Sequence, residues 1–108
     1  MVGRDLMTAT RIASAAEAAG YQAARVDEPL RLPKPADVDI AFVDWDDRQP
    51  GWADTLLGWR AGSAPAPRLL LFGSHRDVAG HREARTSGLG PMMARSKLFA
   101  SLPALLDE

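Results

Sequence analysis

Two short runs of apolar residues constrain the fold of this chain more than any other feature. One run covers residues 38–43 and is interrupted only by Asp39, and the other covers residues 68–72, with three leucines at its centre. Strands that are apolar at nearly every position belong to sheets covered on both faces, because neither side of such a strand can face water. The sequence therefore predicts an α/β domain in which a parallel sheet carries helices on both faces.

Helical patterns alternate with these runs. We predict helices over residues 8–19, 52–60 and 97–106, and another from a cap at Ser74 or Asp77 to Ser87. Shorter strands are predicted over residues 21–26 and 91–94. Three prolines in residues 27–37 leave room for at most one turn of a second helix. The first strand has only the residues before Asp5, so it is either short or cut short where the sequence begins.

Composition excludes several classes of protein. A chain of 108 residues with 46% hydrophobic content fits a single domain over residues 1–108. Its net charge of -1 argues against general binding to nucleic acid or to an anionic membrane. No apolar stretch approaches the roughly 20 residues of a membrane span. With no cysteine and no secretory pattern at the N-terminus, we expect a cytoplasmic protein.

Two acidic residues are predicted to meet at one edge of the sheet. Asp44 directly follows the first apolar run, and Asp5 follows the short first strand. The carboxyl ends of parallel strands border the crevice in which such sheets bind ligands. For Asp5, capping of the first helix is at least as good an interpretation as metal binding. For Asp44 the alternatives are a phosphoacceptor, a solvated loop acid, or an ion cluster with Arg4 and Arg95 that lowers its pKa, which we rank first.

The order of these elements resembles the receiver domain of bacterial two-component response regulators. The likeness is carried by DLMTATRI at residues 5–12, IAFVDW at residues 40–45 and GLGPMMAR at residues 88–95. It implies a flavodoxin-like fold with a five-stranded parallel sheet of strand order 2-1-3-4-5, here with the first strand and second helix abbreviated. It also implies that Asp44 holds the phosphoacceptor position and that Asp5 and Asp44 would bind Mg²⁺ in a working member.

This sequence departs from the family pattern at three positions. Arg4 replaces one of the two acids expected after the first strand, and a guanidinium there repels Mg²⁺. Ser74 lies a residue or two beyond the place of the family's switch hydroxyl. Arg95 takes the approximate place of a conserved lysine. The residues Arg4, Asp5, Ser74 and Arg95 around Asp44 therefore read as a degenerate active site.

We accordingly expect a stand-alone, non-enzymatic signalling or adaptor module that acts through protein contacts, without regulated phosphorylation and without a cofactor. Its partner would be another protein or a second copy of the chain. By the resemblance, the contact surface would include His81, Arg82, Arg85, Met92 and Leu98. The alternative is a functional single-domain response regulator, phosphorylated on Asp44 with Mg²⁺ and supplied by a histidine kinase.

Overall fold

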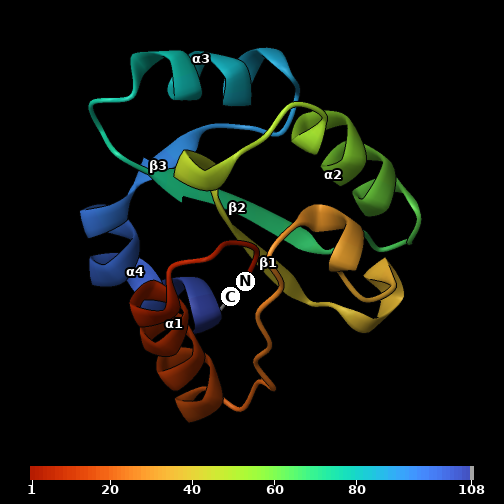
Figure 1. Ribbon diagram of the computed structural model, residues 1–108. Helices are drawn as coiled ribbons and strands as arrows, with labels where there is room; N and C mark the ends of the chain where they lie inside the picture. The colour runs from red at the N-terminus through yellow and green to blue at the C-terminus, as the bar shows by residue number, and fades with distance from the viewer. Residues whose placement is uncertain (108) are drawn as a thin grey trace.

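The computed structural model describes residues 1–107 and contains a three-stranded, all-parallel sheet with strand order β1-β2-β3 (Figure 1). The strands are β1 (Ile40–Asp44), β2 (Arg68–Gly73) and β3 (Met92–Ala94). Asp44 pairs with Phe72, and Gly73 pairs with Ala94, so the three strands end close to one another. Both apolar runs thus form neighbouring strands where the sequence predicted them.

Within residues 1–107, four α-helices precede, connect and follow the strands. They are α1 (Leu6–Ala18), α2 (Trp52–Ala61), α3 (Val78–Thr86) and α4 (Arg95–Asp107). Asp5 caps α1, because its side chain accepts hydrogen bonds from the backbone N–H groups of Met7 and Thr8. Asp77 caps α3 in the same way through the N–H of Gly80. Capping by Asp5 starts α1 two residues before the helix that the sequence predicted.

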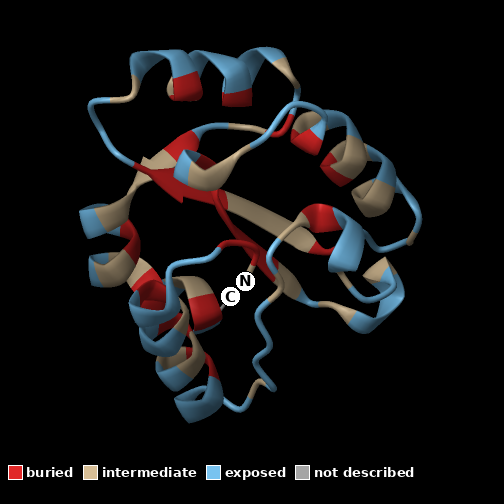
Figure 2. Ribbon diagram, in the orientation of Figure 1, coloured by how far each residue is buried: buried red, intermediate tan, exposed pale blue. Residues whose placement is uncertain are grey.

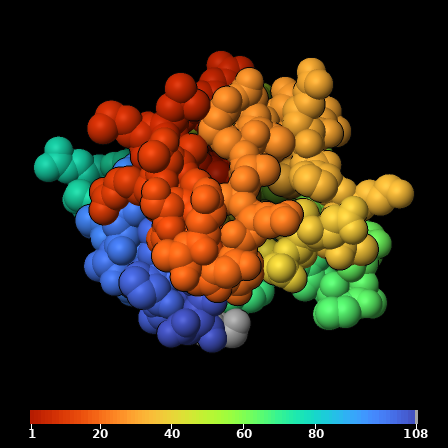
Figure 3. Space-filling view, turned by 90° about the horizontal axis from the view of Figure 1, so that it is seen from below, coloured from red at the N-terminus to blue at the C-terminus, as the bar shows by residue number. Residues whose placement is uncertain are grey.

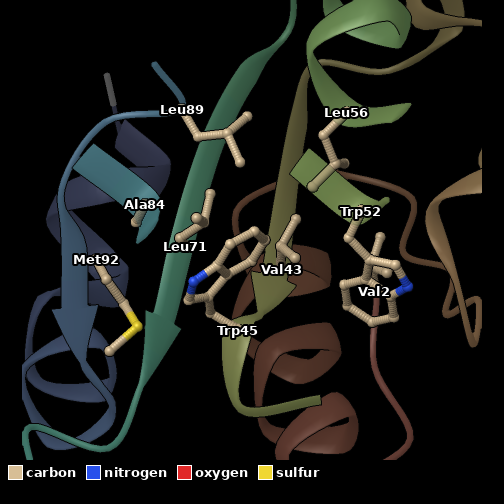
Figure 4. Close-up of a cluster of buried hydrophobic side chains, with 9 residues drawn as sticks. All are labelled: Val2, Val43, Trp45, Trp52, Leu56, Leu71, Ala84, Leu89 and Met92. Atoms are coloured by element: carbon tan, nitrogen blue, oxygen red, sulfur yellow. The ribbon is translucent and has the colours of Figure 1, made fainter. Parts of the chain in front are cut away.

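The helices lie on both faces of the sheet, as predicted (Figure 1). One core cluster joins Val43 and Leu71 to α2 and α3, with Trp45 at its centre (Figure 4). The other joins Phe42 and Phe72 to α1 and α4. Neighbouring residues on a strand point to opposite faces, which is why adjacent positions enter different clusters. The sheet is accordingly the most deeply buried layer of the molecule (Figure 2).

The prediction of a five-stranded, flavodoxin-like sheet is wrong, because residues 1–107 form a sheet of only three strands. The expected first strand is reduced to Val2, which makes isolated parallel bridges to Val26 and Val43. A strand requires consecutive pairs of residues, whereas Val2 makes single bridges. Residues 21–25, predicted as part of a strand, therefore have no neighbouring strand to pair with and remain irregular.

The segment predicted to hold an abbreviated second helix forms two single turns of 3₁₀-helix, η1 (Pro29–Arg31) and η2 (Pro35–Asp37). Each begins with a proline, which suits the first position of a helical turn but prevents the turn from extending a helix already begun. A third such turn, η3 (Trp45–Asp47), follows β1 directly. Within residues 1–107, no helix has the length and apolar character needed to cross a membrane.

Candidate functional site

Asp44 is a buried carboxylate at the end of β1. Only 2% of its surface is exposed. One carboxylate oxygen, Oδ1, accepts a hydrogen bond from the backbone N–H of Asp46 at 3.2 Å, which starts η3. Gly3 packs so closely that a Cβ atom there would lie 2.8 Å from the Cβ of Asp44. The sequence prediction that Asp44 ends a strand at this edge is confirmed, and the chain around it leaves almost no room for solvent.

Arg95 provides the positive charge that faces Asp44. It is the first residue of α4 and follows β3 directly, so its side chain reaches across the end of β2. Its Nη2 atom lies 3.0 and 3.1 Å from the two carboxylate oxygens of Asp44 and 3.2 Å from Oδ2 of Asp46. The guanidinium also lies over the ring of Phe72, 5.0 Å from its centroid. One cation therefore serves both acids.

Asp5 joins the same network through Thr8. The Thr8 hydroxyl accepts a hydrogen bond from Nη1 of Arg95 at 3.0 Å and donates one to Asp5 Oδ2 at 2.8 Å. The same carboxylate oxygen lies 4.0 Å from Arg95 Nη1. The hydrogen bonds from Thr8 are the main reason why the pKa of Asp5 lies below its ordinary value. The predicted meeting of Asp5 and Asp44 therefore takes place around a guanidinium.

Asp46 connects the site to the loop after β2. Its two carboxylate oxygens each accept a hydrogen bond of 3.0 Å from the backbone N–H of Ser74. This approach depends on Gly73, because a Cβ atom there would lie 2.6 Å from Asp46 Oδ1. Ser74 contributes its backbone, while its hydroxyl accepts a hydrogen bond from the N–H of Arg76. Ser74 thus helps to hold Asp46 in place.

Arg4 does not take part in the network as predicted. Its backbone N–H donates to Asp47 at 2.9 Å, and within residues 1–107 its guanidinium forms no ion pair with Asp5 or Asp44. The hydrogen bond and charge of Arg25 are the main cause of the lowered pKa of Asp27, and the positive charge of Arg4 adds to this effect. The predicted ion cluster with Asp44 thus contains Arg95 alone of the two arginines.

Burial is the main cause of the shift in the pKa of Asp44. Removal of the carboxyl group from water raises its pKa above the ordinary value, and the hydrogen bond from Arg95 opposes this shift without cancelling it. The nearby carboxylates of Asp46 and Asp47 raise the pKa further. The lowered pKa that we predicted assumed two guanidiniums and neglected the cost of burying the charge. The structure supplies one guanidinium and a nearly closed site.

The arrangement does not fit a Mg²⁺ ion. Within residues 1–107, no three histidine, aspartate or glutamate side chains converge in a way that could hold a metal. The space in which Asp5 and Asp44 would share a cation is crossed by the guanidinium of Arg95, which already bonds Asp44 and approaches Asp5. Divalent cations need several oxygen ligands at about 2.0–2.6 Å, and an adjacent guanidinium repels them.

A shallow hollow of about 780 Å³ lies over the exposed side of this network. Its lining includes Arg11, Asp46, His75 and Arg95. The guanidinium of Arg11 stacks on the ring of Phe99, 3.7 Å from its centroid, and so forms one wall. Arg95 can therefore be reached from the surface, while Asp44 behind it is shielded.

The residues predicted for a partner surface divide into two groups. Arg82 and Arg85 are exposed on α3, and His81 is half-buried there. Met92 and Leu98 are 6% and 0% exposed, because they face the core from β3 and α4. They therefore cannot contribute to a contact surface, and the resemblance-based prediction is corrected at these two positions.

Sequence reasoning missed Asp46, Thr8 and a second charged cluster. In that cluster Arg48 contacts Asp77 at 2.8 Å and Glu83 at 2.5 Å, which fastens η3 to α3. Asp46 could have been predicted from the sequence as a site residue, since it stands two residues after Asp44, directly beyond the predicted strand. Comparison of the chain with family models, curated proteins and solved structures found no match. The functional argument therefore rests on the geometry of the site.

Proposed function

We propose that this chain is a receiver-like signalling or adaptor module of the cytoplasm that acts by protein contact, without catalysis and without regulated phosphorylation. One observation supports this proposal above all others. The guanidinium of Arg95 stands between the acids, bonded to Asp44 and Asp46 and 4.0 Å from Asp5. The chain thus supplies its own permanent cation where a phosphorylated relative would bind a metal ion.

This arrangement opposes phosphoryl transfer to Asp44 in two ways. A nucleophilic carboxylate must be reached in line by the phosphoryl donor, and Asp44 is 2% exposed with both oxygens engaged by Arg95. The transferred group also carries negative charge that is normally neutralised by a divalent cation, for which the acids leave no room. We infer that the Asp44–Arg95 pair has a structural role.

Exposed apolar side chains at the same edge of the sheet favour a protein partner. The helices α1 and α3 both begin at the carboxyl ends of the strands. In their first turns Leu6, Met7 and Val78 are 63%, 81% and 67% exposed. Large apolar side chains in such positions stabilise contacts more readily than they stabilise the free protein. We propose that this rim, with Arg82 and Arg85 on α3, meets another protein or a second copy of the chain.

Phosphorylation can be tested directly. The protein is incubated with Mg²⁺ and acetyl phosphate, and with a phosphorylated histidine kinase as a second donor, and its intact mass is then measured. We expect no phosphoryl adduct on the wild type or on Asp44→Asn. An adduct that forms on the wild type and disappears in Asp44→Asn would support the alternative function, a working response regulator.

The contact surface is tested by the state of association. Sedimentation equilibrium measures whether the protein forms a dimer at micromolar concentration, and the same measurement follows binding to any identified partner. Met7→Glu places a charge in the exposed rim and should weaken the association at least tenfold. Leu30→Glu is the matched control, because Leu30 is 78% exposed on η1 and lies outside the rim. If the two substitutions weakened the association equally, the rim would not be the contact surface.

A further inference from the structure

The shallow hollow beside Arg95 has no role in the proposed function. Its volume of about 780 Å³ lies within the range of about 300–1,000 Å³ found for small-molecule sites. Its walls come from α1, the start of α4 and the loop after β2. Figures 1 and 3 show α1, in red, directly beside α4, in blue. Asp44 and Asp5 do not line the hollow, so it is distinct from the phosphoacceptor position.

Two contacts between α1 and α4 hold two arginines at the hollow. Thr8 accepts a hydrogen bond from Arg95 Nη1 at 3.0 Å, and the guanidinium of Arg11 lies 3.7 Å from the centroid of the Phe99 ring. Thr8 and Arg11 are three residues apart on α1, and Arg95 and Phe99 are four apart on α4, so each pair shares one face of its helix. A helical turn rises about 5.4 Å. The two contacts, and with them the two guanidiniums, are therefore roughly one turn apart.

Both guanidiniums keep donors for a ligand. Within residues 1–107 the guanidinium of Arg11 forms no hydrogen bond or ion pair, and its contact with Phe99 is made through its face. The two Nη atoms of Arg95 bond Thr8 and the acids, whereas its Nε atom makes no hydrogen bond in the same part of the chain. A guanidinium carries five N–H donors in one plane, which suits the oxygens of a phosphate group. Two guanidiniums about one turn apart can bind different oxygens of the same phosphate.

The other polar residues of the hollow add groups of both kinds. Ser74, His75 and Ser96 line it, and within residues 1–107 the side chains of His75 and Ser96 make no hydrogen bond. Asp46 is the acid of the lining, and its side chain is 32% exposed, so its carboxylate can accept from a hydroxyl group of a ligand. Two arginines and one aspartate give the lining a net charge of +1 when His75 is neutral. This charge suits one phosphate group, whereas a triphosphate would be repelled by Asp46.

We propose that the hollow binds the phosphate monoester of a small hydroxylated compound, with the phosphate between Arg11 and Arg95 and a hydroxyl group of the ligand on Asp46. Phe99 and Ala100 provide an apolar wall for its carbon skeleton. Binding is reversible, and no bond to Asp44 is formed. This inference goes beyond the proposed function, because it concerns a small ligand and not a protein partner. The rim experiment and the experiment below can therefore fail independently.

Amide NMR of the full chain with glycerophosphate as the probe tests this site. The amide signals of Ser74, His75 and Ser96 should shift together, with an affinity at least about tenfold higher than for glycerol or sulfate, because each of these carries only part of the recognised groups. Added salt should weaken the binding. Shifts spread over the whole surface, no shifts at millimolar probe, or equal affinity for sulfate would overturn the proposal. Tighter binding of a phosphoserine peptide than of glycerophosphate would overturn the assignment to a small molecule.

Two substitutions in the hollow have matched controls outside it. Arg11→Gln removes a cation and should weaken glycerophosphate binding about fivefold or more, whereas Arg82→Gln, at an exposed position on α3, should not. Ser96→Asp places a negative charge in the hollow and should abolish binding. Unfolding cannot cause this loss, because an acid in the first turn stabilises a helix. Ser14→Asp, at an exposed position on α1 outside the hollow, should keep wild-type affinity. Wild-type affinity in Arg11→Gln or Ser96→Asp would refute the proposal.

Discussion

The Nη2 atom of Arg95 lies 3.0 and 3.1 Å from the two carboxylate oxygens of Asp44, although the two residues are 51 positions apart in the sequence. The contact passes across the end of β2 and connects the last residue of β1 to the first residue of α4. Because Asp44 is 2% exposed, this guanidinium replaces only part of the hydration that the carboxylate gave up on folding. The pair therefore ties the start of the last helix to the centre of the sheet.

Replacing the cation should destabilise the protein strongly. Arg95→Ala leaves the Asp44 carboxylate buried without its charged partner, and we expect a loss of about 2–4 kcal/mol in the free energy of unfolding. Urea denaturation followed by circular dichroism measures this loss. Arg82→Ala, at an exposed position on α3, is the control and should change stability by less than about 0.5 kcal/mol. A loss of similar size in both variants would contradict the structural role of the pair.

The pH dependence of stability should carry the signature of Asp44. Its pKa is raised in the folded state above the ordinary 3.8, mainly by burial, so the folded protein holds this proton more tightly than the unfolded chain does. Stability from this group is therefore present at low pH and is lost as the pH rises from 3.8 through the raised pKa. The wild type should lose stability relative to Asp44→Asn over that interval.

Carbon NMR of the Asp44 carboxyl group measures the pKa of this residue directly in the folded protein. Its titration midpoint should lie above 3.8, and Arg95→Ala should move the midpoint higher, because the arginine lowers the pKa. Asp5 provides the internal comparison, since its hydrogen bonds from Thr8 place its midpoint below 3.8. An Asp44 midpoint below that of Asp5 would show that the ion pair outweighs burial.

Much of the sheet could be predicted from the sequence because its signals are local. The two runs that became β1 and β2 are apolar at nearly every position. A strand needs this pattern only where both of its faces are covered by other elements. The caps Asp5 and Asp77 also act on N–H groups within three residues. Placing Asp44 at the end of a strand required no knowledge of distant residues.

The errors concern features that depend on distant parts of the chain. Residues 21–25 have a sequence suited to a strand, but in the described part of the chain, residues 1–107, the nearest pairing is the isolated bridge between Val2 and Val26. The burial of Asp44, and so the direction of its pKa shift, depends on how closely Gly3 and Arg95 pack against it. The family resemblance pointed to the right edge of the sheet but overestimated the number of strands.

A methyl group at Gly73 should disturb the site more than its size suggests. The Cβ atom of Gly73→Ala would lie 2.6 Å from Asp46 Oδ1 and 3.3 Å from the sulfur of Met92, so Asp46 must give up its position between Ser74 and Arg95. We expect a loss of about 1–3 kcal/mol in the free energy of unfolding, as for other overpacked sites.

The chain contains a matched control for this substitution. Gly58 lies inside α2, and a Cβ atom there would have nothing within 4 Å. Gly58→Ala should therefore stabilise the protein by about 0.5–1 kcal/mol through helix propensity. Urea denaturation measures the free energy of unfolding of both variants. A decrease for Gly73→Ala and an increase for Gly58→Ala would support the crowding described at Gly73. Destabilisation by Gly58→Ala would argue against the packing described for α2.

The indole N–H of Trp45 should matter more than that of Trp59, although both donate a single bond to a backbone carbonyl. Trp45 is 2% exposed and donates to the carbonyl of Gly80 at 3.0 Å, which fastens α3 to η3. Trp59 donates to the carbonyl of Pro33 at 2.8 Å in an exposed position. In Trp45→Phe the carbonyl of Gly80 loses the indole donor, which it binds in addition to its helical partner, and the smaller ring leaves a void; together these should cost about 2–3 kcal/mol. In Trp59→Phe water can replace the lost donor, so the cost should stay below about 1 kcal/mol.

Urea denaturation of both variants measures the difference, and hydrogen exchange should show faster opening of α3 in Trp45→Phe alone. Equal costs, or unchanged exchange in α3, would mean that α3 is held by its apolar contacts and by Arg48 without help from this bond.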